Sequence, residues 1–183
     1  MTAPIPVVVA GALGRMGAEV IRAVTGAADC TLVGAIDNTP GKEGMDVGLE
    51  LGLEELTVAV TADFEGCLCA VSQSVRDAGK AAVLVDFTHP SVVYEHTRAA
   101  IAYGVHPVIG TTGLTPQQLQ DLSVFSAKAS IGGAVIPNFS VGMVLLQQAA
   151  AAAARFYDHA ELTELHHNLS LIHISEPTRQ WSI

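Results

Sequence analysis

Apolar residues occur along the chain in short uninterrupted runs, separated by longer stretches with helical spacing. The runs 5–10, 31–36, 57–61, 82–87, 105–109 and 132–136 are rich in Val, Ile and Ala and predict strands that are buried on both faces. Helices are predicted from about residue 15 to 25, over 67–79, over 91–103 with Ser91 as its cap, and from a Thr115-Pro116 start, with a loop and a short helix over 38–55. Strands that alternate with helices predict an α/β fold, a Rossmann-type doubly wound parallel sheet.

The pattern changes after the last predicted strand. An apolar helix is predicted over 141–156 and a further strand over 160–165. Too few residues follow to complete another domain, which usually needs about 50. We therefore predict a dinucleotide-binding domain over 1–139, the beginning of a truncated α+β substrate and oligomerisation domain over 140–167, and a non-native tail over 168–183.

The composition narrows the range of partners and compartments. Half of the 183 residues are apolar and the net charge is −9, with only 9 Lys and Arg, so binding to nucleic acid or to an anionic membrane is not expected. The run 141–154 is too short to span a bilayer. The three cysteines Cys30, Cys67 and Cys69 fit a reducing cytoplasm. Cys67 and Cys69 have the spacing of a metal clip, but we favour two small buried residues and expect no metal.

The loop Gly11-Ala-Leu-Gly-Arg-Met-Gly17 joins the first predicted strand to the first helix, which is the context that dinucleotide binding requires. Gly14 lets the backbone approach a pyrophosphate, and Gly17 lets the helix pack close to the sheet. Asp37 ends the second strand, where an acid accepts hydrogen bonds from the adenosine ribose. Its charge disfavours the 2′-phosphate of NADPH, whereas Arg15 and Lys42 offset that repulsion, so NADH and NADPH both remain candidates.

Three further loops follow predicted strands and contain small or hydroxylated residues. They are Phe87-Thr88, Gly110-Thr-Thr-Gly113 and Pro137-Asn-Phe-Ser140. In a doubly wound sheet such loops meet the nicotinamide half of the cofactor and the substrate. Each loop alone is also compatible with ordinary turn chemistry. His89 and His106 adjoin prolines and are assigned no role in the site.

Near the end of the chain, the run Glu161-Leu-Thr-Glu-Leu-His-His167 contains two adjacent histidines. Histidine titrates near neutral pH and is able to deliver a proton as hydride arrives from a nicotinamide. Together with the glycine loop, the motifs Gly110-Thr-Thr-Gly113, Asn138-Phe-Ser-Val-Gly142 and Glu164-Leu-His-His167 closely resemble those of the 4-hydroxy-tetrahydrodipicolinate reductases, also called dihydrodipicolinate reductases. The resemblance covers residues 5–167.

This resemblance implies the reduction of a cyclic dicarboxylate by NADH or NADPH, in which 4-hydroxy-tetrahydrodipicolinate gives tetrahydrodipicolinate on the route to diaminopimelate and lysine. It implies that His166 is the catalytic acid and base, that His167 contacts the substrate, and that the intact parent is a homotetramer. Including the strand-end loops, the predicted cofactor contacts are Gly11, Ala12, Leu13, Gly14, Arg15, Met16, Asp37, Phe87, Thr88, Gly110, Thr111, Thr112, Pro137, Asn138 and Phe139.

The resemblance stops shortly after the histidine pair. The family carries a proton-donating lysine four residues after the first histidine, and this chain has Ser170 there. A Ser-Gly-Thr segment that grips a substrate carboxylate is also missing. The run 170–179 resembles translated sequencing-adapter read-through, and we hypothesise that the natural gene diverges at about Asn168, so that His173 belongs to no site.

These departures leave two main interpretations of this chain. One is a reductase that is inactive as it stands, and the other is a non-catalytic NAD(P)-binding module. A third interpretation, a different small-substrate dehydrogenase, requires the histidine run to be a coincidence. The native DNA beyond codon 167 tests the hypothesis about the tail.

Overall fold

The computed structural model describes residues 3–77, 79–136 and 139–157 of the chain. The chain divides into two compact units, Met1–Pro137 and Asn138–Ile183.

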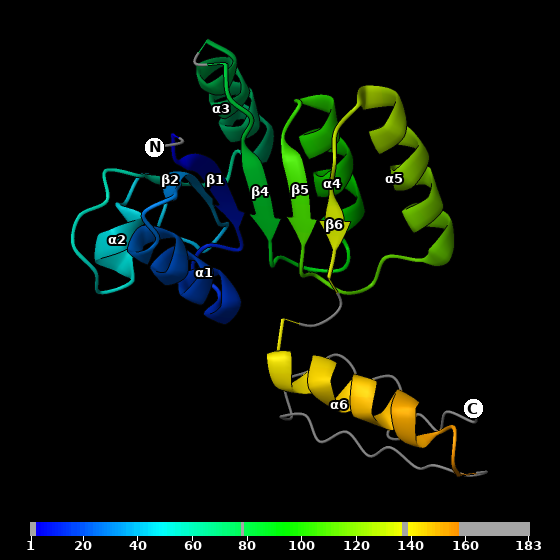
Figure 1. Ribbon diagram of the computed structural model, residues 1–183. Coiled ribbons are helices and arrows are strands. Elements are labelled where there is room, and N and C mark those ends of the chain that lie inside the picture. The colour runs from blue at the N-terminus through cyan, green and yellow to red at the C-terminus, as the bar shows by residue number, and fades with distance from the viewer. Residues whose placement is uncertain (1–2, 78, 137–138, 158–183) are drawn as a thin grey trace. The chain divides into compact units, whose positions relative to one another are not determined.

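The first unit is built on a six-stranded sheet in which all paired strands are parallel (Figure 1). Its strands are β1 (Ile5–Ala10), β2 (Cys30–Ile36), β3 (Val60–Thr61), β4 (Val83–Asp86), β5 (His106–Ile109) and β6 (Ala134–Val135), in the spatial order β3-β2-β1-β4-β5-β6. The chain builds one side of the sheet outward from β1 and then returns to build the other side from β4. The predicted doubly wound sheet is therefore confirmed. The order in which strands are added reverses between β1 and β4, and folds of this kind bind ligands at that point.

Five helices connect these strands: α1 (Arg15–Gly26), α2 (Val47–Glu50), α3 (Phe64–Asp77), α4 (Val93–Ala102) and α5 (Pro116–Ala129). Figure 1 shows α1 and α2 beside β1 and β2, and α4 and α5 beside β5 and β6. The edge strands β3 and β6 are shorter than the predicted runs 57–61 and 132–136. Each pairs with a neighbour on one side only, so fewer of its residues are held in the sheet.

Alternate residues of β1 contribute to two separate cores. Val8 belongs to a buried cluster with Leu68 of α3 and Ala100 of α4. Val9 belongs to another cluster, which contains Ile21 of α1. These five side chains are all fully buried. Because successive side chains of a strand point to opposite faces, β1 must be apolar throughout, as the sequence predicts.

The predicted start of α5 is confirmed in detail. The Thr115 side chain accepts a hydrogen bond from the Gln118 amide at 3.2 Å, and the Gln118 side chain accepts one from the Thr115 amide at 2.9 Å. Pro116 occupies the first turn, where its missing amide costs nothing. This reciprocal cap fixes the point at which the loop after β5 becomes a helix.

The predicted cap of α4 is wrong. Val92, not Ser91, occupies the N-cap position. The Nδ1 atom of His89 accepts a hydrogen bond from the Ser91 amide and lies 2.9 Å from the Ser91 hydroxyl. The serine side chain is thus held in the preceding turn by His89, and the helix begins at Val93.

Helix α3 also begins earlier than predicted, at Phe64 instead of Cys67. The Asp63 carboxylate accepts a hydrogen bond from the Gly66 amide at 2.9 Å. An acid just before a helix satisfies an amide that the helix itself leaves unpaired. Asp63 therefore extends the helix by one turn beyond its apolar part.

Of the second unit, the structure describes residues 139–157. Helix α6 (Val141–Ala153) confirms the helix predicted from residue 141. Its exposed apolar side chains include Val141, Val144, Leu145 and Leu146. Within the described ranges, none of the helices combines the length and apolar character that crossing a bilayer requires. The predicted strand over 160–165 lies outside these ranges.

Candidate functional site

The carboxyl ends of β1, β4 and β5 lie at one edge of the sheet, as the parallel arrows in Figure 1 show. The loop after β1 starts at Gly11, the loop after β4 at Phe87 and the loop after β5 at Gly110. Parallel pairing therefore brings together three of the loops that the sequence predicts to line a ligand site. We call them the glycine loop (11–14), the β4 loop (87–90) and the β5 loop (110–113).

Two glycines, one in the glycine loop and one in the helix that follows it, have no room for side chains. Gly11 has a φ of +76°, and a Cβ atom there would lie 2.5 Å from the Phe87 carbonyl oxygen. A Cβ atom on Gly17, in the first turns of α1, would lie 1.9 Å from the Gly11 carbonyl oxygen. The Gly14 amide donates to that same oxygen at 3.0 Å. These glycines are needed because the loop is pressed against both its own helix and the β4 loop.

The Asp37 carboxylate connects the glycine loop to the end of β2. Its Oδ2 atom accepts a hydrogen bond from the Leu13 amide at 2.8 Å. Its Oδ1 atom accepts from the amide and the hydroxyl of Thr39, at 2.9 and 2.6 Å. The sequence predicts that Asp37 meets an adenosine ribose, but it does not predict the hydrogen bond from Leu13.

The first turn of α1 faces outward at the same edge. Gly14 occupies the N-cap position without a side-chain cap bond, and Arg15 and Met16 are exposed. The first amides of a helix have no partner within the helix and carry a partial positive charge. A phosphate or another anion is therefore well matched to this turn.

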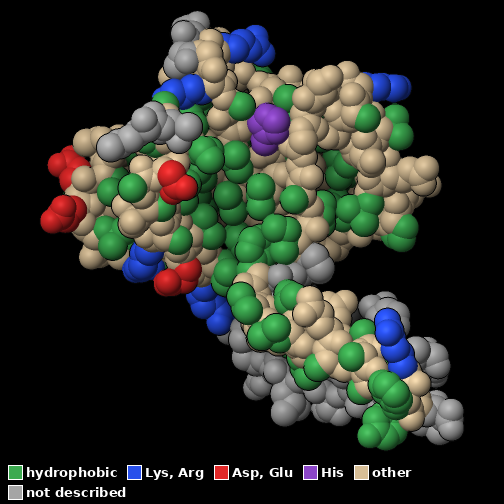
Figure 2. All heavy atoms as spheres, in the orientation of Figure 1, with side chains coloured by type: hydrophobic (Ala, Val, Ile, Leu, Met, Phe, Trp, Pro, Cys, Tyr) green, Lys and Arg blue, Asp and Glu red, His purple; other side chains and the backbone are tan. Residues whose placement is uncertain are grey.

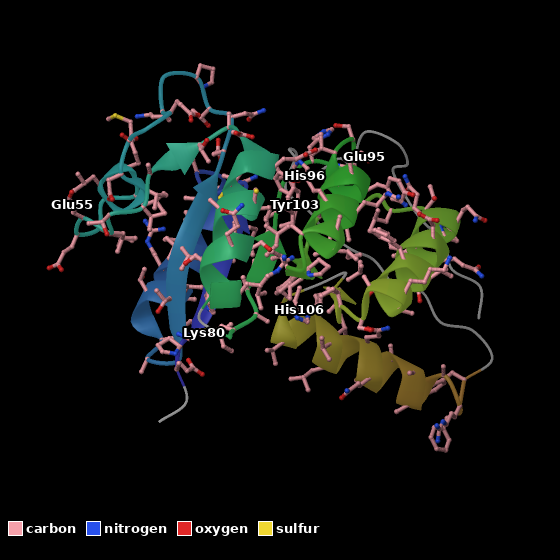
Figure 3. All side chains as sticks on the ribbon, turned by 90° about the horizontal axis from the view of Figure 1, so that it is seen from above. Glu55, Lys80, Glu95, His96, Tyr103 and His106 are labelled. Atoms are coloured by element: carbon pink, nitrogen blue, oxygen red, sulfur yellow. The ribbon has the colours of Figure 1, made fainter. Side chains whose placement is uncertain are left out.

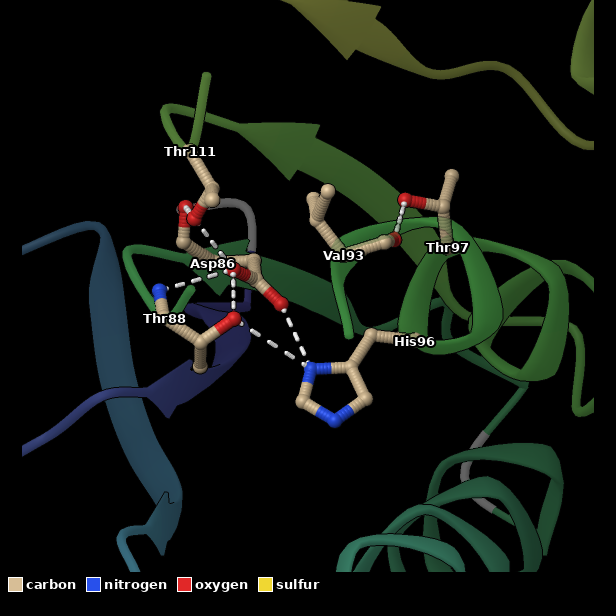
Figure 4. Close-up of polar contacts among 6 residues, drawn as sticks. All are labelled: Asp86, Thr88, Val93, His96, Thr97 and Thr111. Atoms are coloured by element: carbon tan, nitrogen blue, oxygen red, sulfur yellow. Dashed lines mark hydrogen bonds and ion pairs between the residues drawn. The ribbon is translucent and has the colours of Figure 1, made fainter. Parts of the chain in front are cut away.

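The β4 loop is organised by Asp86, a fully buried carboxylate at the end of β4 (Figure 4). Its Oδ1 atom accepts hydrogen bonds from the Thr88 amide at 2.9 Å, the Thr88 hydroxyl at 2.7 Å and the Thr111 hydroxyl at 2.7 Å. Its Oδ2 atom lies 2.9 Å from Nδ1 of His96. One carboxylate thus ties the β4 loop to the β5 loop and to α4.

Burial alone would raise the pKa of Asp86, because it removes water from the charged form. Hydrogen bonds from His96, Thr111 and Thr88 outweigh that effect, so the pKa lies below the ordinary value of an aspartate. The carboxylate is therefore ionised at neutral pH. An ionised carboxylate only accepts hydrogen bonds, so each of its partners must donate.

His96 is a residue of α4, and its side chain lies between α4 and α3. Its ring stacks on that of Phe64 at the start of α3, with ring centroids 3.8 Å apart and planes 10° apart. Figure 3 shows His96 on the side of α4 that faces α3. Because the ionised Asp86 only accepts, Nδ1 of His96 carries a proton and donates it to Oδ2.

The β5 loop is pressed against the β4 loop by a second close approach. A Cβ atom on Gly110 would lie 2.2 Å from the Phe87 ring. Thr111 is buried, whereas Thr112 is exposed. The loops after β4 and β5 are thus fixed to each other both by packing and by the shared carboxylate.

The structure brings together most of the predicted site but not all of it. Gly11, Phe87, Thr88, Gly110 and Thr111 form one connected group at the sheet edge, as described above. Phe139 belongs to the second unit and is exposed. Four predicted site residues lie outside the described ranges: Pro137, Asn138, His166 and His167.

Sequence reasoning missed Asp86 and His96. Asp86 carried a signal, because an acid inside an otherwise apolar run must be paired when it is buried. His96 carried none, since nothing in a helical sequence shows which strand its side chain faces. His106, which was set aside, lies at the start of β5, with Nδ1 2.9 Å from the Gly132 carbonyl oxygen.

Cys67 takes a structural position. A Cβ atom on Gly34 would lie 2.8 Å from Sγ of Cys67, so this thiol packs directly on β2. Burial, with a smaller contribution from Asp63, raises the pKa of Cys67 to about 11. A thiol with that pKa is a poor metal ligand and nucleophile at neutral pH.

The surface around this edge is uneven in chemical character. In Figure 2, hydrophobic side chains run across the middle of the visible face, over β1 and β4, and acidic side chains gather toward α1 and α2. Lys42 forms an ion pair with Glu50 of α2 and is thereby partly neutralised. The surroundings of Asp37 are thus not strongly basic.

The comparisons with known proteins agree with this geometry. A family described as "Dihydrodipicolinate reductase, N-terminus" matches residues 5–139. A 4-hydroxy-tetrahydrodipicolinate reductase of Synechococcus sp. (strain CC9605) is 90% identical over 168 residues, which are 92% of this chain and 61% of that protein. The corresponding protein of Prochlorococcus marinus (strain MIT 9313) is 78% identical over 90% of this chain and 59% of its own length. The chain thus spans about three fifths of the length of these relatives.

Solved structures support the same fold. A dipicolinate-bound dihydrodipicolinate reductase from Paenisporosarcina sp. TG-14 superposes with a TM-score of 0.68 at 30% identity, covering 86% of this chain and 56% of its own. A WlbA dehydrogenase from Thermus thermophilus, in complex with NAD and α-ketoglutarate, gives a TM-score of 0.63 at 16% identity, covering 81% and 47% of the two chains, and supports the fold alone. With the family match extending over most of the chain, the conclusion is that this chain belongs to the dihydrodipicolinate reductase family.

Proposed function

We propose that this chain contains the cofactor-binding part of a reductase that forms tetrahydrodipicolinate from 4-hydroxy-tetrahydrodipicolinate with NADH or NADPH, on the route to diaminopimelate and lysine. The observation that carries the proposal is the glycine loop at the switch point of the sheet. Gly11 in this loop and Gly17 just after it have no room for side chains, and the first turn of α1 lies beside the loop. This arrangement suits a pyrophosphate, which needs a close backbone approach and free amides.

The glycine loop residues Gly11 to Gly14 and the amides of Arg15 and Met16 are proposed to hold the pyrophosphate. Asp37 is proposed to receive the adenosine ribose. Both of its oxygens already accept hydrogen bonds from Leu13 and Thr39, so its position is fixed before a ligand arrives. A group held in place beforehand loses less entropy when it binds a ligand.

Of the two cofactors, the arrangement around Asp37 favours NADH. A 2′-phosphate would approach the negative charge of Asp37, and Lys42, which the sequence offered as a counter-charge, is paired with Glu50. Arg15 is exposed and remains available to meet a phosphate. We therefore propose a preference for NADH that is moderate in size.

The β4 and β5 loops are proposed to receive the nicotinamide half, through Phe87, Thr88, Gly110, Thr111 and Thr112. The cofactor supplies the hydride in such a reduction. The contribution of these residues is to orient the ring, and the mutual packing of Phe87 and Gly110 keeps the two loops at a fixed spacing. Such rigidity is what an orienting site requires.

The substrate is proposed to be a small cyclic dicarboxylate, since the relative from Paenisporosarcina carries dipicolinate. His166 is proposed as the acid and base and His167 as a substrate contact. We further propose that this chain does not turn over as it stands, because Ser170 occupies the place where the family resemblance predicts a lysine. A neutral hydroxyl cannot replace a cation opposite a dianion, and the loss amounts to about 2–5 kcal/mol.

One experiment separates the parts of this proposal. The purified chain is titrated with NADH and with NADPH by the change in nicotinamide fluorescence, and is then assayed for oxidation of either cofactor with 4-hydroxy-tetrahydrodipicolinate. We expect binding without turnover, and turnover in a matched chain that carries the lysine and the remaining segment of the Synechococcus relative. Absence of NADH and NADPH binding would refute the proposed cofactor site.

The alternative function, a non-catalytic NAD(P)-binding module, shares the cofactor site and differs in the second assay. It is favoured if the extended chain also binds NADH and fails to reduce the substrate. Turnover by the unextended chain would instead contradict the role assigned to the missing lysine.

A further inference from the structure

We propose that His96 is a positioning residue for the nicotinamide half of the site, acting through Asp86 on the hydroxyl groups of Thr88 and Thr111. This inference rests on the proposed cofactor function and adds to it a residue that lies on a helix and in none of the predicted loops. The hydrogen bonds of the buried Asp86 carboxylate are distributed unevenly between its two oxygens.

The two oxygens of Asp86 are held unequally (Figure 4). Oδ1 receives the amide and hydroxyl of Thr88 and the hydroxyl of Thr111, all within 2.9 Å. Among the described residues, the partner recorded for Oδ2 is Nδ1 of His96, at 2.9 Å. His96 therefore holds Oδ2 and, together with the three donors at Oδ1, fixes the rotation of the carboxylate about its side chain.

The ring of His96 is itself fixed on its other side. It stacks on Phe64 at 3.8 Å, nearly parallel, and Phe64 packs on the core cluster between the sheet and α3. The His96 side chain is only 19% exposed. A ring held between an aromatic face and a carboxylate has one orientation, and in that orientation Nδ1 donates to Asp86.

The hydroxyls of Thr88 and Thr111 each have one proton, and both protons are directed to Oδ1 of Asp86. The lone pairs of the Thr111 hydroxyl therefore remain for other donors, and the Thr88 hydroxyl, which also lies 3.5 Å from Nδ1 of His96, keeps one lone pair beyond that contact. Neither hydroxyl is free to donate outward while Asp86 keeps its orientation. The primary amide of a nicotinamide is a donor of the required kind. His96 thus keeps the hydroxyls of both threonines as acceptors, which match the donating NH₂ group of the nicotinamide amide.

If His96 only stabilised the fold, its loss would weaken all ligands of the edge alike. The proposal predicts a selective effect, because Thr88 and Thr111 lie on the β4 and β5 loops, whereas the pyrophosphate and adenosine are assigned to the glycine loop and Asp37. ADP-ribose contains the adenosine and pyrophosphate but lacks the nicotinamide. Comparing NADH with ADP-ribose therefore isolates the half of the site on which His96 is proposed to act.

The experiment uses the full chain and two variants of similar size. In H96N the amide nitrogen takes the place of Nδ1, and in H96Q it takes the place of Nε2, away from Asp86. Dissociation constants for NADH and ADP-ribose are measured by calorimetry, with the melting temperature of each variant as a control. We expect H96Q to raise the Kd for NADH about tenfold and that for ADP-ribose less than about twofold, and H96N to stay within about threefold for both.

A second pair of variants tests the same step without touching His96. T111V removes the hydroxyl at nearly constant shape, and T111S restores it. T111V should show the selectivity expected of H96Q, and T111S should not. Equal weakening of both ligands, or no weakening of either, would overturn the role of His96 and leave the proposed cofactor site standing. If the unaltered chain binds neither ligand, the proposed function fails and this inference fails with it.

Discussion

The two sides of the carboxyl edge are built by opposite means. On the side of β1 and β2, the glycine loop is shaped by the absence of side chains, and its main brace is the bond from Leu13 to the partly buried Asp37. On the side of β4 and β5, the loops are shaped by side chains that converge on the fully buried Asp86. The glycine side is therefore sensitive to added volume, and the carboxylate side to lost hydrogen bonds.

This difference suits the ligand groups that each side is proposed to hold. A pyrophosphate has many equivalent oxygens and needs backbone amides brought close, which glycine permits. A nicotinamide ring has a single productive orientation and needs fixed donors and acceptors, which a saturated carboxylate provides. The two sides should therefore respond differently to substitution.

The largest effect is expected from G17A. The added Cβ atom would lie 1.9 Å from the Gly11 carbonyl oxygen, and backbone cannot yield as a flexible side chain does. We expect the free energy of unfolding to fall by about 3 kcal/mol or more, with loss of NADH binding. Urea denaturation and fluorescence titration measure the two changes.

Gly26, the last residue of α1, provides the matched control, because a Cβ atom there meets nothing within 4 Å. G26A should change stability by less than about 1 kcal/mol and leave NADH binding intact. Equal urea midpoints for G17A and G26A would show that the close approach to Gly11 does not restrict the loop.

D86N tests the carboxylate side. The substitution leaves a single oxygen to accept the hydrogen bonds that both oxygens of Asp86 accept in the unaltered chain. We expect the free energy of unfolding to fall by about 2–4 kcal/mol. D121N, on the exposed surface of α5, removes a carboxylate that binds Tyr94 and Arg98 and should have a much smaller effect. A D86N protein as stable as D121N would contradict the importance of the buried network.

The difference in stability between the unaltered chain and D86N should depend on pH, with a definite sign. The pKa of Asp86 is lowered by folding, so its ionised form stabilises the folded state above the unfolded pKa of about 4 and ceases to do so as the pH falls through the folded pKa. The stability difference between the unaltered chain and D86N should thus be constant from neutral pH to about pH 5 and shrink below about pH 4. A difference that grows with acid would show that the sign is wrong.

D37N tests the glycine side without altering volume. Removing the negative charge should reduce the preference for NADH over NADPH by about tenfold, because the 2′-phosphate is no longer repelled. E50Q is a complementary change that releases Lys42 from its ion pair, and we expect NADPH binding to improve by about two- to threefold. Unchanged cofactor preference in both variants would remove Asp37 as a determinant.

The smallest effect on the site is expected from T115A, which lies beyond both sides of the edge. Loss of the reciprocal cap with Gln118 should lower the free energy of unfolding by about 1 kcal/mol. The Kd for NADH should not change. A change in Kd comparable with that of D37N would show that the two sides are less separate than the contacts indicate.

The contrast between the two sides also explains what the sequence revealed. The glycine loop, the order of strands and helices, and the cap at Thr115 depend on residues close together in the chain, and the sequence predicted them. Asp86 and Thr111 lie 25 residues apart, and their contact exists only because β4 and β5 are neighbours. The residue type of Ser91 suits a helix cap, but the Ser91 amide donates a hydrogen bond to the His89 side chain instead. That contact depends on local geometry, which residue types do not determine.

The central position of β1 also bears on how the chain is made. β1 pairs with β2, which follows it closely, and with β4, which follows only after β2, β3 and three helices. At about 5–20 residues per second of synthesis, one edge of β1 waits roughly 4–15 s for its partner. An apolar strand with an open edge attracts other strands, so we expect nascent chains arrested before β4 to require chaperones. Chains arrested after β5 should not require them.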